Sequence, residues 1–247
     1  MNTLGGATEV ARGIYRCGSE RVNWYLVRED GRFTVVDAGF PAHYPQLLGA
    51  LEALGAEVDD IEGCLLTHAH PDHIGFAERL RTQIGVPVRL HPSEIQRARD
   101  GGDPPLGGFL KNLWRPAVLA YFVEVARSKG ISVPGVTSAE KFEDGAEVDV
   151  PGRPQVIHVP GHTEGEVAFY LPEREVLFCG DALATVEFET WRGHEPQLLP
   201  EWINEDHARA RRSLDRLEGL GEVGLLPGHG PPWTGPMEEA VFRAQTT

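Results

Sequence analysis

The chain of 247 residues, 41% of them hydrophobic, is long enough for one large domain or two small ones with a complete core. Its 23 Lys and Arg stand against 37 Asp and Glu, and the resulting net charge of −14 repels phosphate backbones and anionic lipid, which disfavours a role on nucleic acid or on a membrane surface. Three cysteines without a C-x-x-C pair argue against a disulfide framework or a thiolate zinc site and favour a reducing compartment.

Predicted strands and helices alternate over the first 90 residues. Short runs rich in β-branched and aromatic residues, separated by Gly-Ser and Asp-Gly turns, predict an antiparallel meander at 13–17, 22–28 and 32–37. Leucines at helical spacing then predict a helix at 44–54. The sequence continues with an apolar segment typical of a buried strand, a helix that ends at a glycine, and another strand, at 61–67, 72–84 and 86–90.

The pattern changes between residues 92 and 130, which we interpret as a helical insertion. Ser93 is placed to cap a short helix that runs through Arg99, and a Gly-Gly-Asp-Pro-Pro run at 101–105 interrupts it. Large apolar residues at helical spacing follow at 109–127. This insertion is interpreted either as packed surface helices, as a dimer surface, or as an apolar lid over a site, with candidate lining residues Phe109, Trp114, Tyr121 and Phe122.

The second half of the chain repeats the alternation of strands and helices. We predict strands at 155–159, 167–171, 175–179 and 223–226, and helices at 200–217 and 235–244. Strands in both halves with helices between them predict an α/β fold in which two sheets pack face to face and carry helices outside. Because no linker or internal repeat interrupts the pattern, we expect residues 1–247 to form a single domain.

The strongest chemical signal is the segment 67–73, which reads Thr-His-Ala-His-Pro-Asp-His and joins an apolar strand to a helix. His68 and His70, two apart in an extended stretch, point to the same side, and Asp72 and His73 follow at the turn. Three imidazoles and a carboxylate so close together repel one another on protonation, or leave ring nitrogens unpaired when buried. A bound divalent cation removes both problems, so the segment predicts a metal site.

Three further residues of ligand type occur in one recurring setting. His162, Asp181 and His229 each follow an apolar strand through a turn that contains glycine, where the backbone can approach an ion closely. One such residue is common by chance, whereas three of them together with the first motif favour a shared metal centre.

These motifs, in this order, resemble those of the metallo-β-lactamase-fold hydrolase superfamily, in its glyoxalase II and lactonase-like branch. The resemblance spans nearly the whole chain and implies a four-layer αβ/βα sandwich with two mostly antiparallel sheets flanked by helices. It also implies two divalent metal ions, most often zinc and in some members iron or manganese. The family pattern assigns His68, His70 and His162 to the first ion. It assigns Asp72, His73 and His229 to the second, with Asp181 bridging the two.

The implied activity is that of a dinuclear metallohydrolase. Two cations lower the pKa of a bridging water, and the hydroxide attacks a small ester, lactone or thioester. Asp72 is the candidate catalytic residue, because it can also orient the nucleophile or transfer a proton. The expected partner is a small-molecule substrate, with no nucleic acid and no membrane, and a homodimer is possible. With no signal peptide and no apolar run near ~20 residues, we expect a cytoplasmic protein.

Departures from individual family patterns narrow the choice. His70 stands where flavodiiron oxidoreductases have glutamate, and the common zinc β-lactamases use a residue other than aspartate at position 181. The stretch 161–166 resembles the glyoxalase II motif, with Glu166 where that family often has histidine, but only 18 residues follow His229, too few for its glutathione-binding domain. Ala184 stands where quorum-quenching lactonases have tyrosine. The alternatives are a mononuclear iron enzyme of persulfide-dioxygenase type, a β-lactam hydrolase, and a metal-stabilised binding protein.

The remaining histidines and the cysteine beside Asp181 carry weaker signals. Cys179 is expected to be a buried strand residue rather than a nucleophile. His91 and His158 are expected to be structural, and His43, His194 and His207 to lie on the surface. The loop after Asp181 offers candidates for substrate contact, namely Glu187, Trp191 and His194, whereas Arg192, which could pair with a carboxylate, is expected to be solvated.

Overall fold

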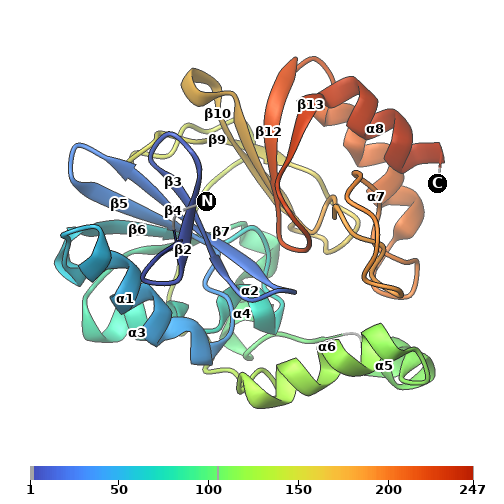
Figure 1. Ribbon diagram of the computed structural model, residues 1–247, viewed down its shortest axis with the longest axis horizontal. Helices are drawn as coiled ribbons and strands as arrows, with labels where there is room; N and C mark the ends of the chain where they lie inside the picture. Colours follow the sequence, from blue (N-terminus) through green and yellow to red (C-terminus); the bar gives the residue numbers. More distant parts are fainter. Residues whose placement is uncertain (1–2, 105, 247) are drawn as a thin grey trace.

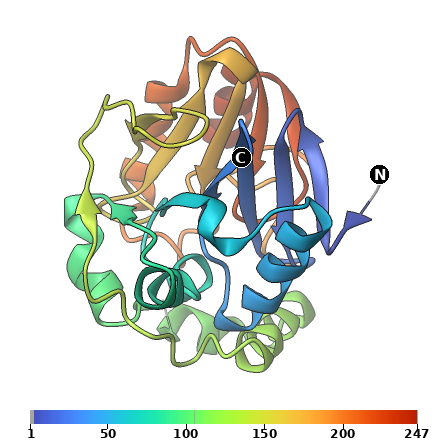
Figure 2. The same ribbon diagram turned by 90° about the vertical axis from the view of Figure 1, so that its left-hand side faces the viewer.

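The computed structural model describes residues 3–104 and 106–246 and forms two mixed β-sheets (Figures 1 and 2). The first sheet has eight strands in chain order, antiparallel from β1 to β5 and parallel from β5 to β8. These strands are β1 (Thr3–Leu4), β2 (Ala7–Ala11), β3 (Ile14–Gly18), β4 (Asn23–Glu29), β5 (Arg32–Val36), β6 (Ile61–Leu65), β7 (Val88–Leu90) and β8 (Glu140–Lys141).

The second sheet has the strand order β13-β12-β11-β10-β9, and within it β11 and β12 run parallel. Its strands are β9 (Gln155–His158), β10 (Val167–Leu171), β11 (Val176–Gly180), β12 (Glu222–Pro227) and β13 (Trp233–Pro236). Both sheets contribute apolar side chains to one buried cluster, in which Tyr25 and Val27 of β4 meet Phe169 of β10 and Phe178 of β11. The two sheets therefore pack face to face.

Helices cover the outer face of each sheet. The outer face of the first sheet packs on α1 (Tyr44–Ala53) and α3 (Ala77–Gln83), and that of the second on α8 (Met237–Thr246), beside which α7 (His207–Ser213) lies. The order helix, sheet, sheet, helix confirms the predicted four-layer α/β sandwich. The remaining helical segments are α2 (Pro71–Ile74), α4 (Ile95–Arg99), α5 (Leu106–Asn112), α6 (Pro116–Arg127), η1 (Pro41–His43), η2 (Val58–Asp60), η3 (Pro92–Glu94), η4 (Pro172–Arg174) and η5 (Leu214–Leu217).

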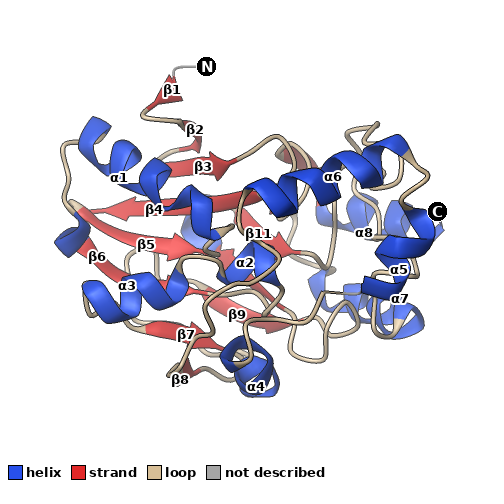
Figure 3. Cartoon of the chain, turned by 90° about the horizontal axis from the view of Figure 1, so that it is seen from below, coloured by secondary structure: helices blue, strands red, loops and turns tan. Residues whose placement is uncertain are grey.

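The predicted insertion contributes α5 and α6, which lie outside the sandwich on the side where α2 lies (Figures 1 and 3). Apolar side chains of both helices pack on the loop after β11, for example Phe109 and Val118 against Phe188 and Ile203. Pro105 of the predicted 101–105 break lies outside the described residues. Among residues 3–104 and 106–246, no helix combines the length and apolarity that crossing a membrane requires.

Three predicted helices differ from the structure. The segment 72–84 is broken into α2 and α3 because the backbone N–H groups of Gly75 and Phe76 donate to the carbonyl oxygens of Gly39 and Ala38, at 2.7 Å and 3.1 Å, instead of continuing the helical hydrogen bonds. The segment 109–127 is likewise split at Pro116, which begins α6. The helix predicted at 200–217 begins only at His207, capped by the side chain of Asp206, and its end is the 3₁₀ turn η5.

Candidate metal centre

The histidine-rich segment lies where β6 leaves the first sheet. β6 pairs in parallel with β5 and β7, and residues 66–70 pass from its end to α2. His70 has extended backbone angles and Pro71 begins the helix, so Asp72 and His73 fall in its first turn. From the second sheet, His162 follows β9, Asp181 follows β11 and His229 follows β12. The centre is therefore assembled from loops of both sheets.

The first cluster consists of His68, His70 and His162, joined by Asp181. His68 Nε2 and His162 Nε2 lie 3.1 Å and 3.0 Å from the same atom, His70 Nδ1. His162 Nε2 is also 3.4 Å from Asp181 Oδ2. All four side chains are at least 93% buried, so three ring nitrogens and a carboxylate converge on one point away from solvent.

The second cluster consists of Asp72, His73 and His229. His229 Nε2 lies 3.5 Å from Asp72 Oδ2, and His73 Nε2 lies 3.8 Å from the same oxygen. Asp181 reaches this cluster as well, with Oδ1 3.4 Å from His73 Nε2 and Oδ2 3.3 Å from His229 Nε2. The carboxylate of Asp181 thus stands between the two clusters and faces imidazoles of both.

The imidazole nitrogens that point away from the centre also have partners. His73 Nδ1 lies 2.9 Å from Asp37 Oδ2, and His229 Nδ1 lies 2.6 Å from the carbonyl oxygen of Arg21. An acceptor on the far nitrogen leaves the near nitrogen unprotonated, which is the form that binds a metal.

Two of the three histidines of the first cluster, His68 and His162, also have partners on the ring nitrogen that points outward. His162 Nδ1 lies 3.1 Å from Asn204 Oδ1. His68 Nδ1 lies 3.1 Å from Thr67 Oγ1 and 3.0 Å from Glu166 Oε2. The hydroxyl of Thr67 in turn donates to Asp37, so this one carboxylate supports a histidine in each cluster.

Buried carboxylates also hold the loops of the centre together. Glu94, at 0% exposure, accepts hydrogen bonds from the backbone of Ala69 at 3.1 Å and of Gly165 at 2.8 Å, and thereby ties the first motif to the loop after β9. Glu166 Oε1 accepts from the backbone N–H of Asp181 at 3.0 Å. Gly228 has no room for a side chain, because a Cβ there would collide with Asp181 and His73.

Burial and neighbouring charges separate the two clusters in their proton affinity. Burial, helped by the neighbouring imidazoles, lowers the pKa of His68 and His70 well below the ordinary value. Burial acts in the same direction on His73, but the carboxylates of Asp181, Asp37 and Asp72 outweigh it and raise the pKa of His73. Protons and cations therefore compete for the second cluster.

The donor set fits a pair of metal ions. His73 Nε2 and Asp181 Oδ1 are buried and have no hydrogen-bond partner among the described residues, which is costly for polar atoms unless a cation occupies the space between them. Imidazole nitrogen and carboxylate oxygen are ligands that zinc, iron and manganese share. The residues present thus fit two ions side by side, without selecting the metal.

An aromatic wall closes the centre on the side of the insertion. Tyr121 of α6 donates a hydrogen bond of 2.6 Å to Asp72 Oδ2, and its ring centroid lies 5.9 Å from that of His229. Burial and the adjacent Asp72 raise the pKa of this phenol well above its ordinary value, so Tyr121 keeps its proton. Between the wall and the two clusters remains a cavity of about 30 Å³, lined also by Phe109, Phe188 and Ile203.

The insertion residues predicted to line a lid divide into two groups. Phe109, Tyr121 and Phe122 line the cavities beside the centre. Trp114, in contrast, was predicted wrongly, because it is 74% exposed, with the guanidinium of Arg115 over its ring.

The structure also places the candidate substrate-contact residues of the loop after β11, and Cys179. Trp191 stacks near Tyr121 and His229, with ring centroids 6.4 Å and 6.2 Å away, whereas Glu187, Arg192 and His194 are exposed. Cys179 is buried in β11, and burial raises the pKa of its thiol, as expected of a structural residue.

One histidine expected on the surface is buried. His43 is only 9% exposed, because its Nδ1 accepts the backbone N–H of Phe40 inside the turn that precedes α1. Burial lowers its pKa to about 4, so it is neutral. His91 and His158 stack on each other with ring centroids 4.4 Å apart, in line with a structural role, and His207 is half-buried beside Asn204.

The fold and the two clusters of histidine and aspartate are those of a metal-dependent hydrolase. The chain belongs to the metallo-beta-lactamase superfamily, whose family model matches residues 18–229. It is 29% identical over 240 residues to the probable metallo-hydrolase YflN of Bacillus subtilis, across 94% of this chain and 89% of that protein. It is 27% identical over 170 residues to the hydroxyacylglutathione hydrolase GloC of Haemophilus influenzae, across 65% of this chain and 66% of that protein. The crystal structure of TTHA1623 in a di-iron-bound form matches with a TM-score of 0.64 and 27% identity, over 94% of this chain and 98% of the other.

Proposed function

We propose that the protein is a dinuclear metallohydrolase that cleaves a small ester, lactone or thioester. In this proposal His68, His70 and His162 hold one ion. A second set, Asp72, His73 and His229, holds the other, and Asp181 is shared between them. The observation that carries the proposal is the position of Asp181, whose two oxygens lie 3.3 to 3.4 Å from imidazoles of both clusters. A carboxylate in this position would be able to hold both cations, and its negative charge would offset part of their repulsion.

When bound, the ions would supply Lewis acidity to the substrate carbonyl and to a water molecule. The remaining tasks fall to side chains of this chain. Asp72 has one oxygen tied to Tyr121, which orients its carboxylate, and it is the residue proposed to orient the nucleophile and to transfer its proton. The aromatic wall of Tyr121, Phe109 and Phe188 excludes bulk water from the reacting group, which strengthens electrostatic interactions there.

The names of two similar proteins support cleavage of a thioester and add iron to the candidate metals. GloC is named a hydroxyacylglutathione hydrolase, which cleaves a thioester, and thioesters are therefore one of the proposed substrate classes. TTHA1623 was solved in a di-iron-bound form. We propose zinc as the metal, with iron or manganese as the competing ions, and a small molecule as the partner.

The test combines metal analysis with a substrate panel. Protein produced with zinc, iron or manganese in controlled supply should bind two ions per chain and hydrolyse at least one of a simple ester, a lactone or a thioester. A single iron per chain together with oxygen consumption on glutathione persulfide would contradict the proposal and indicate persulfide-dioxygenase chemistry. Turnover of a penicillin alone would instead indicate a β-lactam hydrolase. No turnover of any substrate in the panel, with both ions bound, would indicate a binding protein.

A further inference from the structure

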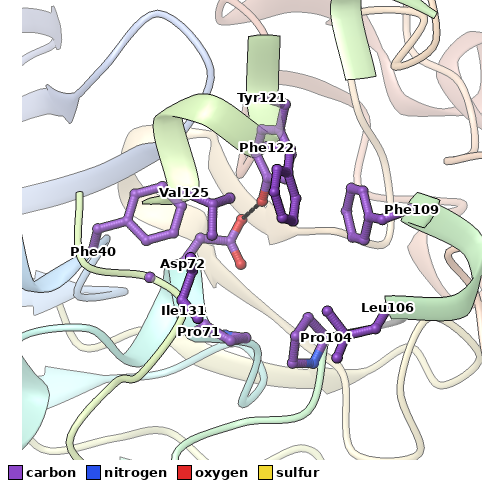
Figure 4. A pocket seen from close by; sticks show the side chains of 11 residues that line it. Phe40, Pro71, Asp72, Pro104, Leu106, Phe109, Tyr121, Phe122, Val125 and Ile131 are labelled. Carbon is purple, nitrogen blue, oxygen red and sulfur yellow. Dashed lines mark hydrogen bonds between the residues drawn. The ribbon is translucent and has the colours of Figure 1, made fainter. Parts of the chain in front are cut away.

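A second and larger cavity lies beside the metal centre, under the insertion (Figure 4). Its volume is about 190 Å³. The side chains that line it come from α2, α5 and α6, from the segments before α5 and after α6, and from the loop that carries Phe40. They are Phe40, Pro71, Asp72, Pro104, Leu106, Phe109, Tyr121, Phe122, Val125 and Ile131, with Gly130 contributing backbone.

This cavity adjoins the small space over the two ligand clusters. Five residues line both cavities, namely Pro71, Asp72, Pro104, Phe109 and Tyr121. In Figure 4 the carboxylate of Asp72 faces the hydroxyl of Tyr121, and Phe40 and Val125 lie to one side of it. The larger cavity is thus placed to receive a group attached to a carbonyl that reacts at the clusters.

The chemistry of the lining selects an uncharged apolar group. The described residues that line the cavity include no lysine, arginine or histidine. The two polar side chains among them, Asp72 and Tyr121, are hydrogen-bonded to each other at 2.6 Å. A charged or strongly polar group placed here would lose its hydration without gaining a partner. The same cost argues that the leaving oxygen or sulfur of the substrate points elsewhere.

The size of the cavity limits the length of that group. A cavity of roughly 150 Å³ in a protein core accommodates benzene, so 190 Å³ corresponds to a ring or chain of about six to eight carbons. The far end is closed near Gly130, where a Cβ would come within 2.5 Å of the Phe40 ring and 3.0 Å of Val125. Longer chains must leave past Ile131, which is 70% exposed at the rim.

We propose that this cavity binds the acyl side of the substrate, and that the natural substrate is an uncharged ester, thioester or lactone whose acyl group is apolar and about six to eight carbons long. The proposal rests on the hydrolase function above. It adds that specificity resides in the insertion, through the side chains that α5 and α6 place against Asp72.

The first experiment measures kcat/KM of the metal-loaded protein on 4-nitrophenyl esters from acetate to dodecanoate, which share one leaving group. We expect kcat/KM to increase by up to about fourfold per added methylene and to stop increasing at six to eight carbons. A rate that is independent of acyl length, or that falls from acetate onward, would overturn the proposal.

The second experiment alters the cavity in opposite directions. Val125→Phe fills the closed end and should move the preferred acyl length down by at least two carbons, and Phe122→Ala enlarges the cavity and should move it up. The matched control is Val123→Phe on the opposite face of α6, which is 37% exposed and should leave the length profile unchanged. Opposite shifts cannot come from misfolding, and identical profiles in all three variants would refute the assignment.

A binding measurement separates this proposal from the proposed function. Octanamide and acetamide are neutral and carry the same polar group, so calorimetry on the metal-loaded protein should detect tighter binding of octanamide, reduced in Val125→Phe. Octanamide binding without hydrolysis of any ester would sink the hydrolase proposal and leave the apolar site standing. Ester hydrolysis with equal binding of both amides would overturn the apolar acyl site and leave the hydrolase proposal standing.

Discussion

Asp37 offers a strong test of how the centre is held together, because it touches no proposed metal ion and still supports a histidine in each cluster. Its side chain is 2% exposed and accepts hydrogen bonds from the backbone and hydroxyl of Thr67 at 2.8 to 3.1 Å, besides its 2.9 Å contact with His73 Nδ1. We consider Asp37→Asn, which keeps the shape and the positive φ of 58° that Asn tolerates.

The magnitude follows from the number of acceptors that are lost. The amide has one oxygen, so either Thr67 N–H or His73 Nδ1 faces an NH₂ group instead of an acceptor. When the NH₂ group faces His73 Nδ1, this nitrogen must accept, and the ring then carries its proton on Nε2, where the metal would bind. Loss of such an outer partner weakens metal binding by about 10- to 100-fold, or about 1.4 to 2.8 kcal/mol. Loss of the bond to a charged group also destabilises the fold by roughly 1.5 to 3 kcal/mol.

The assay is a competition titration with a chromophoric chelator, combined with the metal content after gel filtration. We expect wild type to keep two ions, whereas Asp37→Asn keeps the first and loses most of the second. The matched control is Asp144→Asn, which removes the charge of a partly exposed aspartate that bonds His158 N–H and Arg216 and belongs to neither cluster. Two ions of unchanged affinity in Asp37→Asn would refute the reasoning.

Three other predictions concern the centre. Asp181→Ala should abolish turnover by removing the carboxylate between the two clusters, with far-ultraviolet circular dichroism unchanged, and full activity would exclude the bridging role. Tyr121→Phe should lower the free energy of unfolding by about 1 to 3 kcal/mol, measured in urea, because Asp72 loses a buried partner, and two bound ions should remain. Chelation should lower the melting temperature. An ion at about 1,000 times its Kd stabilises by about 4 kcal/mol, or roughly 8 to 16 °C for a chain of this size, and unchanged melting after confirmed metal removal would contradict the assignment.

The fold class and the convergence of the seven side chains were predictable because each is encoded locally. Alternating apolar runs predict the strands. The spacing of four residues at the end of one strand indicates candidate metal ligands, namely His68, His70, Asp72 and His73. His162, Asp181 and His229 were found because each repeats the same setting, a strand followed by a glycine turn.

The supporting residues were not predictable from local patterns. Asp37, Glu94 and Asn204 are isolated polar residues in sequence, and only the tertiary fold brings them against the backbone and rings of the centre. The break between α2 and α3 has the same origin, since the N–H of Gly75 bonds the carbonyl oxygen of Gly39, 36 positions earlier in a different loop. A signal for Asp37 did exist, namely an aspartate directly after a buried strand next to the one that carries the motif.

Because loops of both sheets supply the candidate ligands, metal binding would affect the stability and the degradation of the protein in the cell. Ions held by His68 and His70 on one side and by His162, Asp181 and His229 on the other would cross-link the halves of the sandwich, as a covalent bridge does in secreted domains. Folding and metal acquisition would then be thermodynamically coupled. In a cell starved of metal, this chain would become a better target for proteases at the same moment as it became inactive, so its abundance would follow metal supply without a dedicated regulator.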